Sequence, residues 1–201
     1  NDPNSEGVYD DPTPIDWNNP YFDAYENPAH DSRDRFFGDV GLRWTILPGL
    51  SISGFVRQDG FTQNLDGRNA PGGRGTPSFW IGKYQSKEMH YEFLAQYNTD
   101  FGDFSLTANL GGNILTQRYD YLQEETQGGF VTPGFYNIAN SLERPSVLNY
   151  LRKKEVRSAY GSATLGYKNT YFLDASLRND ISSALPQNNN SYLYPSVSAS
   201  V

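Results

Sequence analysis

The sequence predicts an all-β fold, in which strands of a transmembrane antiparallel β-barrel make up most of the chain. Three observations predict it. Apolar and polar residues alternate along several segments, the connections between these segments are alternately short and long, and many aromatic residues occur in a polar chain. The 201 residues include 15 Tyr, 12 Phe and 3 Trp, yet the mean hydropathy is -0.66. A barrel reconciles these values, because each strand turns an apolar face to lipid and a polar face to the lumen.

The first predicted hairpin begins at Arg35, where strict alternation starts. Successive side chains of a strand point to opposite faces. Up to Ile46 one face is therefore apolar and the other carries charges. A Pro48-Gly49 turn follows, and the pattern resumes at Leu50.

Two further hairpins repeat this design. Residues 88–98 and 104–114 are joined at Asp100-Phe101-Gly102-Asp103, and residues 159–167 and 171–180 are joined at Lys168-Asn169-Thr170. A last strand begins at Leu193 and runs to Val201. The chain therefore contains about seven predicted strands, an open set that we expect to be part of a larger barrel.

The alternation assigns a face to each strand residue. The residues assigned to lipid are Val40, Leu42, Leu106, Leu110, Leu165 and Leu173. The polar residues assigned to the lumen are Asp39, Arg43, Arg57, Glu88, His90, Glu92, Asn109, Asp174 and Arg178. Aromatic residues near the strand ends are expected to form the interfacial girdles of a barrel: Phe36, Tyr97, Phe104, Tyr167 and Tyr171.

The connections support the membrane assignment. Those at 48–49, 100–103 and 168–170 are short, whereas 60–87, 119–154 and 181–192 are predicted to be long loops. Outer-membrane barrels have short periplasmic turns and long extracellular loops. The predicted strands also have about the length that crosses a bilayer. A soluble antiparallel sheet with one buried face would alternate in the same way, but it leaves the loop pattern unexplained. Helix is expected only within the long loops.

Composition and motifs argue against several other classes. The net charge of -7 argues against a nucleic-acid partner, and the absence of Cys excludes disulfides and thiolate zinc sites. No apolar run is long enough for a transmembrane helix, and the polar start at Asn1 is unlike a signal peptide. No G-x-S-x-G motif occurs, and the glycine-rich segment 67–75 lacks the context of a phosphate loop. We therefore do not predict an enzyme.

Metal sites and cofactors are not predicted either. His90 lies between Glu88 and Glu92 on one face, but residues two apart in a strand are about 7 Å apart, so a hydrated lumen wall is the preferred interpretation. Four aspartates near the start of the chain could supply oxygen ligands for calcium: Asp2, Asp10, Asp11 and Asp16. Their spacing matches no EF-hand loop, and a solvated acidic segment is favoured.

Four stretches, in this order, resemble the SusC/RagA family of TonB-dependent outer-membrane transporters of the Bacteroidota. They are Asn19-Pro20-Tyr21-Phe22 with Tyr25-Glu26-Asn27, Pro133-Gly134-Phe135-Tyr136-Asn137, Arg178-Asn179-Asp180-Ile181-Ser182-Ser183 with Leu185-Pro186, and Tyr194-Pro195-Ser196-Val197-Ser198. The resemblance covers nearly the whole chain. One departure is Ile181, where family members often carry Trp.

The resemblance implies a 22-stranded barrel with an N-terminal plug, opened by TonB, and a SusD-like surface lipoprotein as a lid. Residues 1–32 would then be an extracellular loop segment and 33–201 barrel strands and loops, while the plug and the TonB-contacting segment are not among these residues. The implied function is import of a bulky nutrient, an oligosaccharide or a peptide, across the outer membrane. The alternative is a non-transporting scaffold or a soluble β-sheet binding module.

Within this interpretation, the predicted solute-binding residues are aromatic and amide side chains in the long loops: Trp80, Tyr84, Phe135, Tyr136 and Asn137. In the 119–154 loop, Phe130 and Asn140 complete the set. Aromatic rings can stack on a sugar or peptide while amides fix its orientation. Packing within the loops, or contact with the lid lipoprotein, would use the same residues.

Overall fold

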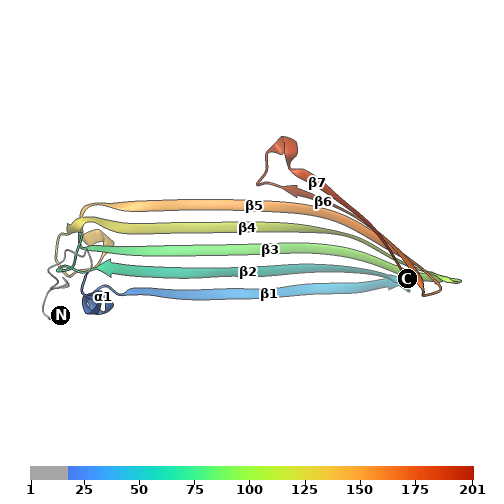
Figure 1. Cartoon of the computed structure of the whole chain (residues 1–201), viewed down its shortest axis with the longest axis horizontal. Helices are drawn as coiled ribbons and strands as arrows, with labels where there is room; N and C mark the ends of the chain where they lie inside the picture. Colours follow the sequence, from blue (N-terminus) through green and yellow to red (C-terminus); the bar gives the residue numbers. More distant parts are fainter. Residues whose placement is uncertain (1–17) are drawn as a thin grey trace. The chain divides into compact units, whose positions relative to one another are not determined.

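The structure, a computed structural model that describes residues 18–201, is one antiparallel sheet whose strands follow one another in chain order (Figure 1). The elements are α1 (Pro20–Glu26), β1 (Ala29–Leu47), β2 (Leu50–Asn69), β3 (Ser78–Phe101), β4 (Phe104–Phe130), η1 (Ile138–Asn140), β5 (Ser141–Tyr167), β6 (Tyr171–Ser182), η2 (Gln187–Asn189) and β7 (Ser191–Ser200). The predicted seven-stranded all-β fold is confirmed. Between residues 18 and 201, no helix is long and apolar enough to cross a membrane.

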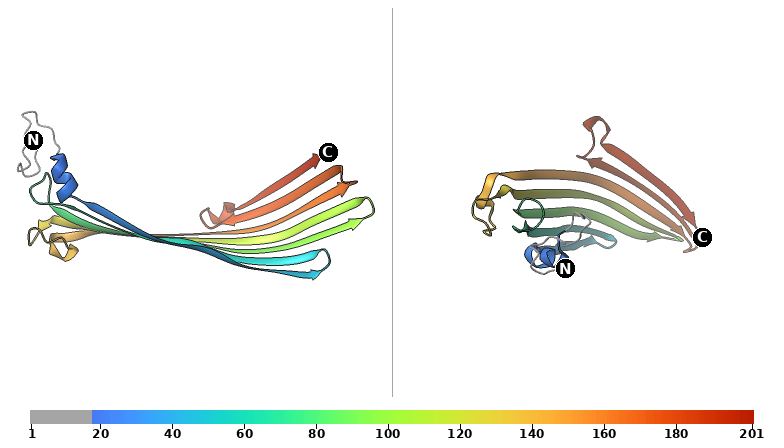
Figure 2. Two further views of the ribbon diagram at one scale, coloured as in Figure 1. Left: turned by 90° about the horizontal axis from the view of Figure 1, so that it is seen from below. Right: turned by 60° about the vertical axis from the view of Figure 1, so that its left-hand side comes forward.

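The three predicted hairpin turns are confirmed, and residues with positive φ make each of them. Gly49 has a φ of 85° and Gly102 a φ of 62°. The third turn places Lys168 and Asn169 at φ 51°, the left-handed region that a tight hairpin requires. Figure 2 shows the three turns at the same end of their strands, as the meander order requires.

The strands run further than the sequence predicts, so the long loops are shorter than expected. β2 continues to Asn69, β3 already begins at Ser78, and the long connections are confined to 70–77, 131–140 and 183–190. β1 likewise begins at Ala29, inside the segment predicted as loop. Strict alternation disappears in these extensions because apolar and polar residues are mixed on both faces there, while the strands continue. The alternation of short and long connections itself is confirmed.

This extension corrects the position of two predicted site residues. Trp80 and Tyr84 lie on β3, not in a loop. The run from Ser78 to Lys87 mixes aromatic, glycine and basic residues, and this mixture hides its strand periodicity in the sequence.

The sheet has no hydrophobic core. In the part of the chain that the structure describes, Ala70 is the one buried hydrophobic residue, whereas Val40 is 79 % exposed, Leu42 76 % and Leu110 65 %. A soluble sheet would bury one face under a second layer. No second layer covers either face within residues 18–201.

Strand register confirms that apolar and polar residues separate onto two faces. Across β5 and β6, Leu165 pairs with Leu173, and the next pair along the strands is Thr164 with Asp174. The apolar stripe continues onto β7, where Val197 pairs with Ala175. Which face meets lipid and which the lumen stays a prediction.

The described residues form two compact units, each containing parts of several strands. One unit, here called the loop unit, contains residues 18–35, 61–86 and 119–151, with the connections 70–77 and 131–140. The other, the turn unit, contains residues 36–60, 87–118 and 152–201, with the three tight turns.

Candidate functional site

The polar face of the turn unit is held together by side-chain contacts between strands. Arg57 on β2 forms an ion pair with Glu92 on β3. Arg43 on β1 donates to Ser51 on β2 and to Gln96 on β3, both at 3.1 Å. These contacts place predicted lumen residues from three strands on one face. Asp39, also predicted there, is exposed on β1.

Glu88 and His90 form a second group on this face. The Glu88 carboxylate accepts a hydrogen bond from Gln117 on β4, and its Oε1 lies 2.8 Å from Nε2 of His90. Residues 18–201 contain no cluster of three or more residues with metal-ligand side chains. The calcium candidates Asp2, Asp10, Asp11 and Asp16 lie outside the described residues.

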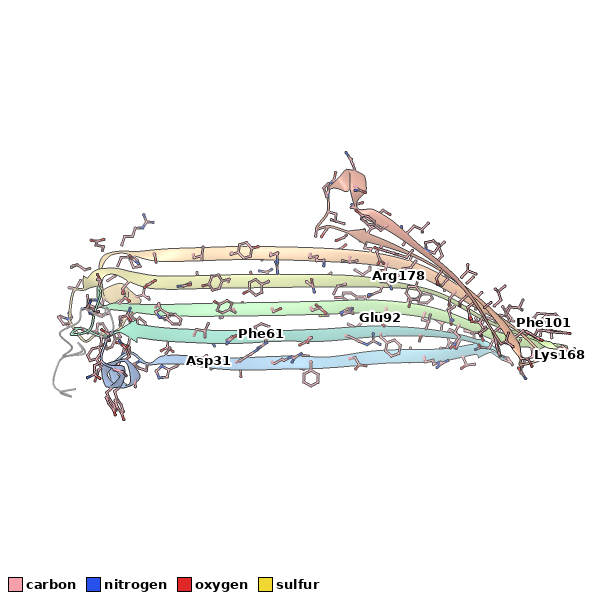
Figure 3. The ribbon with its side chains drawn as sticks, viewed as in Figure 1. Asp31, Phe61, Glu92, Phe101, Lys168 and Arg178 are labelled. Carbon is pink, nitrogen blue, oxygen red and sulfur yellow. The ribbon has the colours of Figure 1, made fainter. Side chains whose placement is uncertain are left out.

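The remaining predicted lumen residues bridge β4, β5 and β6. Arg178 on β6 pairs with Asp180 at 2.8 Å and donates to Ser158 on β5 at 3.1 Å. Asn109 donates to Ser162 at 3.2 Å, and Asp174 accepts from Thr164. Figure 3 labels Glu92 and Arg178 on their strands. The predicted lumen residues are thus spread over strands β1 to β4 and β6.

On the polar face, aromatic rings cover glycines of the neighbouring strand. The sequence did not predict this feature. A Cβ atom at Gly111 would lie 2.5 Å from the Tyr160 ring, and one at Gly41 would collide with Phe55. In the loop unit, a Cβ atom at Gly67 would lie 2.6 Å from the Trp80 ring. Such cross-strand pairing of glycine and aromatic residues pins strand register. Trp80 therefore rests on the neighbouring strand.

A tyrosine cluster is the main aromatic group of the loop unit. The ring centroid of Tyr84 lies 4.5 Å from that of Tyr121 and 6.3 Å from that of Tyr119. Burial, then a hydrogen bond with Tyr84, raises the pKa of Tyr121 to about 12, so its phenol stays neutral. By strand alternation these tyrosines share one face of the loop unit. Tyr119 and Tyr121 were not predicted, although their spacing of two residues places both on one face.

The 131–140 connection is closed by Asn140, which is only 7 % exposed. Its side chain accepts from the Thr132 N–H at 3.0 Å and donates to the carbonyls of Thr132 and Phe135 at 2.8 and 2.6 Å. Asn137 accepts from the Ala139 N–H at 2.9 Å and so caps η1. Both amides therefore hold the loop, and the role of Asn140 in solute binding stays a prediction.

The aromatic residues of this connection differ in their surroundings. Tyr136 packs edge-on against Phe130, with centroids 5.5 Å apart, and the Arg68 guanidinium lies 4.4 Å from the Tyr136 ring centroid. Phe135, in contrast, is 56 % exposed. Of the predicted aromatic set in this loop, Phe135 presents the most accessible ring.

The other connection of the loop unit, residues 70–77, and the end of β2 before it are bound to the segment around α1. The Ala70 N–H donates to Asn27 at 2.7 Å, the Arg74 N–H donates to Asn18 at 2.7 Å, and Arg68 donates to the Glu26 carbonyl at 2.7 Å. Asn18 and Asn27 in turn bind Asp23 of α1. The glycine-rich segment 67–75 is therefore anchored by side chains and is not a freely flexible loop.

The apolar face of the turn unit has an aromatic belt at the turn end. Phe101 and Phe104 stack at 5.6 Å, and Phe104 lies 4.9 Å from Tyr167, which in turn lies 6.4 Å from Tyr171. Phe101 and Lys168 mark this end in Figure 3. The predicted girdle residues Phe104, Tyr167 and Tyr171 thus form one row.

Comparisons with known proteins show which solved structures share this fold. Neither a protein family model nor a curated protein sequence matches the chain. Among solved structures, a chain of the RagAB peptide transporter matches with a TM-score of 0.81 and 19 % identity over 91 % of this chain. The RagAB peptide importer in its closed-closed state matches with a TM-score of 0.81 and 21 % identity over 91 % of this chain.

A more distant match is the siderophore receptor PiuA from Acinetobacter baumannii, with a TM-score of 0.50 and 17 % identity over 84 % of this chain and 29 % of that one. This chain spans 21 % of the length of the matched RagAB chains. The described sheet therefore has the fold of part of a RagAB-like outer-membrane transporter barrel, and the resemblance to SusC/RagA barrels is confirmed at the level of the fold.

Proposed function

We propose that this chain forms part of the barrel wall of a TonB-dependent outer-membrane transporter that imports a bulky nutrient with the help of a SusD-like lipoprotein. The observation that carries the proposal is the seven-stranded sheet without a core, whose fold matches the RagAB transporter. The apolar face of such a sheet needs lipid, and its polar face suits a water-filled lumen.

The dimensions of the apolar face fit a membrane. From Phe104 to Ile114, every second residue of β4 is apolar or glycine. At about 3.3 Å per residue this stretch covers about 33 Å along the strand. At a tilt of about 40° it covers about 25 Å of membrane, the height of the apolar band in outer-membrane barrels.

The solute path runs along the polar face, with the loop unit facing the exterior. Arginine, carboxylate and amide groups of the turn unit keep this path hydrated. In the loop unit, the tyrosine cluster and the exposed Phe135 offer flat apolar surfaces to a sugar ring or a peptide side chain. An oligosaccharide and a peptide both suit this chemistry, and the similarity in fold to the RagAB peptide importer makes a peptide the first class to test.

Uptake by cells that express the full-length protein tests this function. We expect labelled peptide or oligosaccharide to accumulate only when the protein is present, and accumulation to stop when a protonophore collapses the proton gradient. A protein that reaches the outer membrane and retains surface proteins, yet gives no energised uptake of either solute class, would be the non-transporting scaffold. That result would refute transport.

Deletion of the partner lipoprotein gene tests the lid. The proposal expects slower uptake of the same solute and an unchanged amount of barrel in the membrane. Unchanged uptake at limiting solute concentration would remove the lipoprotein from the proposal and leave transport itself standing.

A further inference from the structure

We propose that the open edge of β5 in the loop unit binds an extended peptide solute, which pairs with β5 as an added strand. The inference rests on the proposed function and deepens it, because it chooses the peptide from the two solute classes and gives its binding mode. The loop unit faces the exterior in that proposal, so the edge lies where a solute arrives.

β5 is much longer than the strand that follows it. β6 has 12 residues, and all of them pair with residues 156–167 of β5. β5 has 27 residues and begins at Ser141. Within residues 18–201 the strands beside β5 are β4 and β6. From residue 141 to residue 155, therefore, no described strand lies beside β5 on the side of β6.

Hydrogen bonds at both ends of this stretch show which backbone groups point to the open side. The Glu155 N–H donates to Ser183 Oγ at 2.8 Å, and the Glu155 carbonyl accepts from the Ser183 N–H at 2.9 Å, both on the side of β6. At the other end, the Asn140 carbonyl accepts from the N–H of Val131, directly after β4, at 2.9 Å. Backbone groups of alternate residues point to the same side of a strand. Odd-numbered residues of this stretch therefore point to the open side and even-numbered residues to β4.

The open edge carries a regular series of backbone donors and acceptors. Val147, Asn149 and Leu151 each present an N–H and a carbonyl there, whereas Pro145 presents a carbonyl alone. Proline within a sheet is confined to edges where its nitrogen needs no partner, and its odd-numbered position agrees with this assignment. At about 3.3 Å per residue, residues 146–151 cover about 20 Å, enough for about six residues of an added strand.

Side chains along this edge are exposed on both faces of the sheet. Every residue from 146 to 151 is exposed, and the large apolar side chains among them are Val147 at 60 %, Leu148 at 56 %, Tyr150 at 48 % and Leu151 at 49 %. By alternation Val147 and Leu151 share one face, and Leu148 and Tyr150 share the other. Proteins rarely leave a long apolar strand edge open, because such an edge pairs readily with another chain.

A polypeptide is the ligand whose chemistry matches this edge. An extended chain repeats its N–H and carbonyl groups at the spacing of β5, so it can form a ladder with all three open residues. A sugar ring carries hydroxyl groups without this repeat. Side chains of an added strand would lie beside those of β5 on both faces. The site should therefore prefer apolar, β-branched and aromatic residues and reject proline.

The test uses the full-length protein in detergent micelles. The probe is a fluorescently labelled, acetylated and amidated hexapeptide of alternating Val and Thr. Its control is the same peptide with N-methylated amides along both edges, which keeps the side chains but cannot pair. Amide hydrogen exchange of residues 146–151, followed by mass spectrometry, should be fast in the free protein and slow with the probe. The methylated peptide should leave the exchange unchanged.

Asn149→Pro is the sharpest variant, because it removes an N–H from the open edge and no hydrogen bond to β4. Leu148 lies in a strand, so it already has the extended backbone that a residue before proline adopts. The variant should bind the probe about tenfold more weakly in fluorescence titration, with unchanged heat-modifiable migration of the barrel. Asn149→Ala is the matched control, since it keeps the N–H and should bind as the wild type does.

Equal binding of the methylated peptide overturns the inference, and this comparison needs no variant. Equal binding of the probe by Asn149→Pro overturns it as well. Slow exchange of residues 146–151 without any peptide would show that another segment of the protein or a second copy covers the edge, and would also refute the site.

The same measurements separate this inference from the proposed function. Energised uptake of an oligosaccharide without binding of the probe overturns the peptide edge and leaves transport intact. Absence of energised uptake of either solute class, with exchange still slowed by the probe, overturns the proposed function and leaves the peptide-binding edge.

Discussion

Asn109 and Leu110 are neighbours on β4 whose side chains lie on opposite faces of the sheet. Asn109 is hydrogen-bonded to Ser162, whereas Leu110 is 65 % exposed in the middle of the apolar stripe. Leu110→Arg is expected to destabilise the barrel by about 2–4 kcal/mol, because it puts a charge near the membrane midplane. Asn109→Arg should be much milder. Urea titration of folding into lipid vesicles measures both, and equal tolerance would show that the faces are assigned wrongly.

Gly111 offers a second test at the scale of single residues. A methyl group there would push against the Tyr160 ring, whereas at Gly161, on the other face, the nearest atoms would be 3.5 and 3.9 Å away. Gly111→Ala is therefore expected to cost about 1–3 kcal/mol, the range for overpacking, and Gly161→Ala much less. The same urea titration compares them. A Tyr160→Ala background should remove most of the cost at Gly111; if it does not, the ring contact is not the cause.

At the scale of elements, the hairpins were predictable because an apolar stripe on one face of the sheet imposes alternation on the sequence. The turns also carry local signals in Gly49, Gly102 and Asn169, all of which adopt positive φ. The extensions of β2, β3, β4 and β5 were not predictable in this way. Beyond the apolar band neither face requires apolar residues, so only backbone pairing marks the strand.

The loop interactions were harder to predict than the strands. Phe135, Tyr136 and Asn137 lie in a connection, as predicted, but Asn137 and Asn140 serve as internal clamps of that connection. A short amide side chain can bind a ligand or its own backbone with the same chemistry. Only the three-dimensional position of Asn140 decides between these uses. The tyrosine cluster was missed because its members come from two strands.

The 131–140 connection gives a functional prediction. Replacing Phe135, Tyr136 and Asn137 together with Ala is expected to slow uptake of the native solute several-fold while barrel assembly is unchanged, because loops carry binding residues on rigid scaffolds. Phe135→Ala alone is the sharper variant, since Phe135 is exposed while Tyr136 and Asn137 also hold the loop. Initial uptake rates and the amount of folded barrel are measured together.

Asn140→Ala is the control for this prediction, because it loosens the loop without removing the exposed ring. An equal effect of Asn140→Ala and Phe135→Ala would assign the effect to loop shape. Unchanged solute binding with loss of the lipoprotein from purified complexes would mean that the loop serves the lid, and its role in solute binding would then be wrong.

At the scale of the whole molecule, we expect that residues 1–201 made alone do not form a stable barrel. Within the described residues, β1 and β7 each pair with one neighbour, and unpaired backbone groups are costly in lipid. Heat-modifiable migration on gels and circular dichroism in micelles measure this. A monomeric, cooperative and heat-resistant barrel from these residues would contradict the expectation.

The absence of a buried core has a consequence for how such a chain diverges over evolutionary time. In a globular protein, close packing restricts each interior position by volume and shape. If the apolar face meets lipid, as we propose, its side chains contact a fluid, and any side chain of similar apolar character can serve there. Substitutions can therefore accumulate while the alternation that specifies the sheet is kept. Such weak positional constraint accounts for a TM-score of 0.81 to a RagAB chain at only 19 % sequence identity, and for the lack of a matching family model.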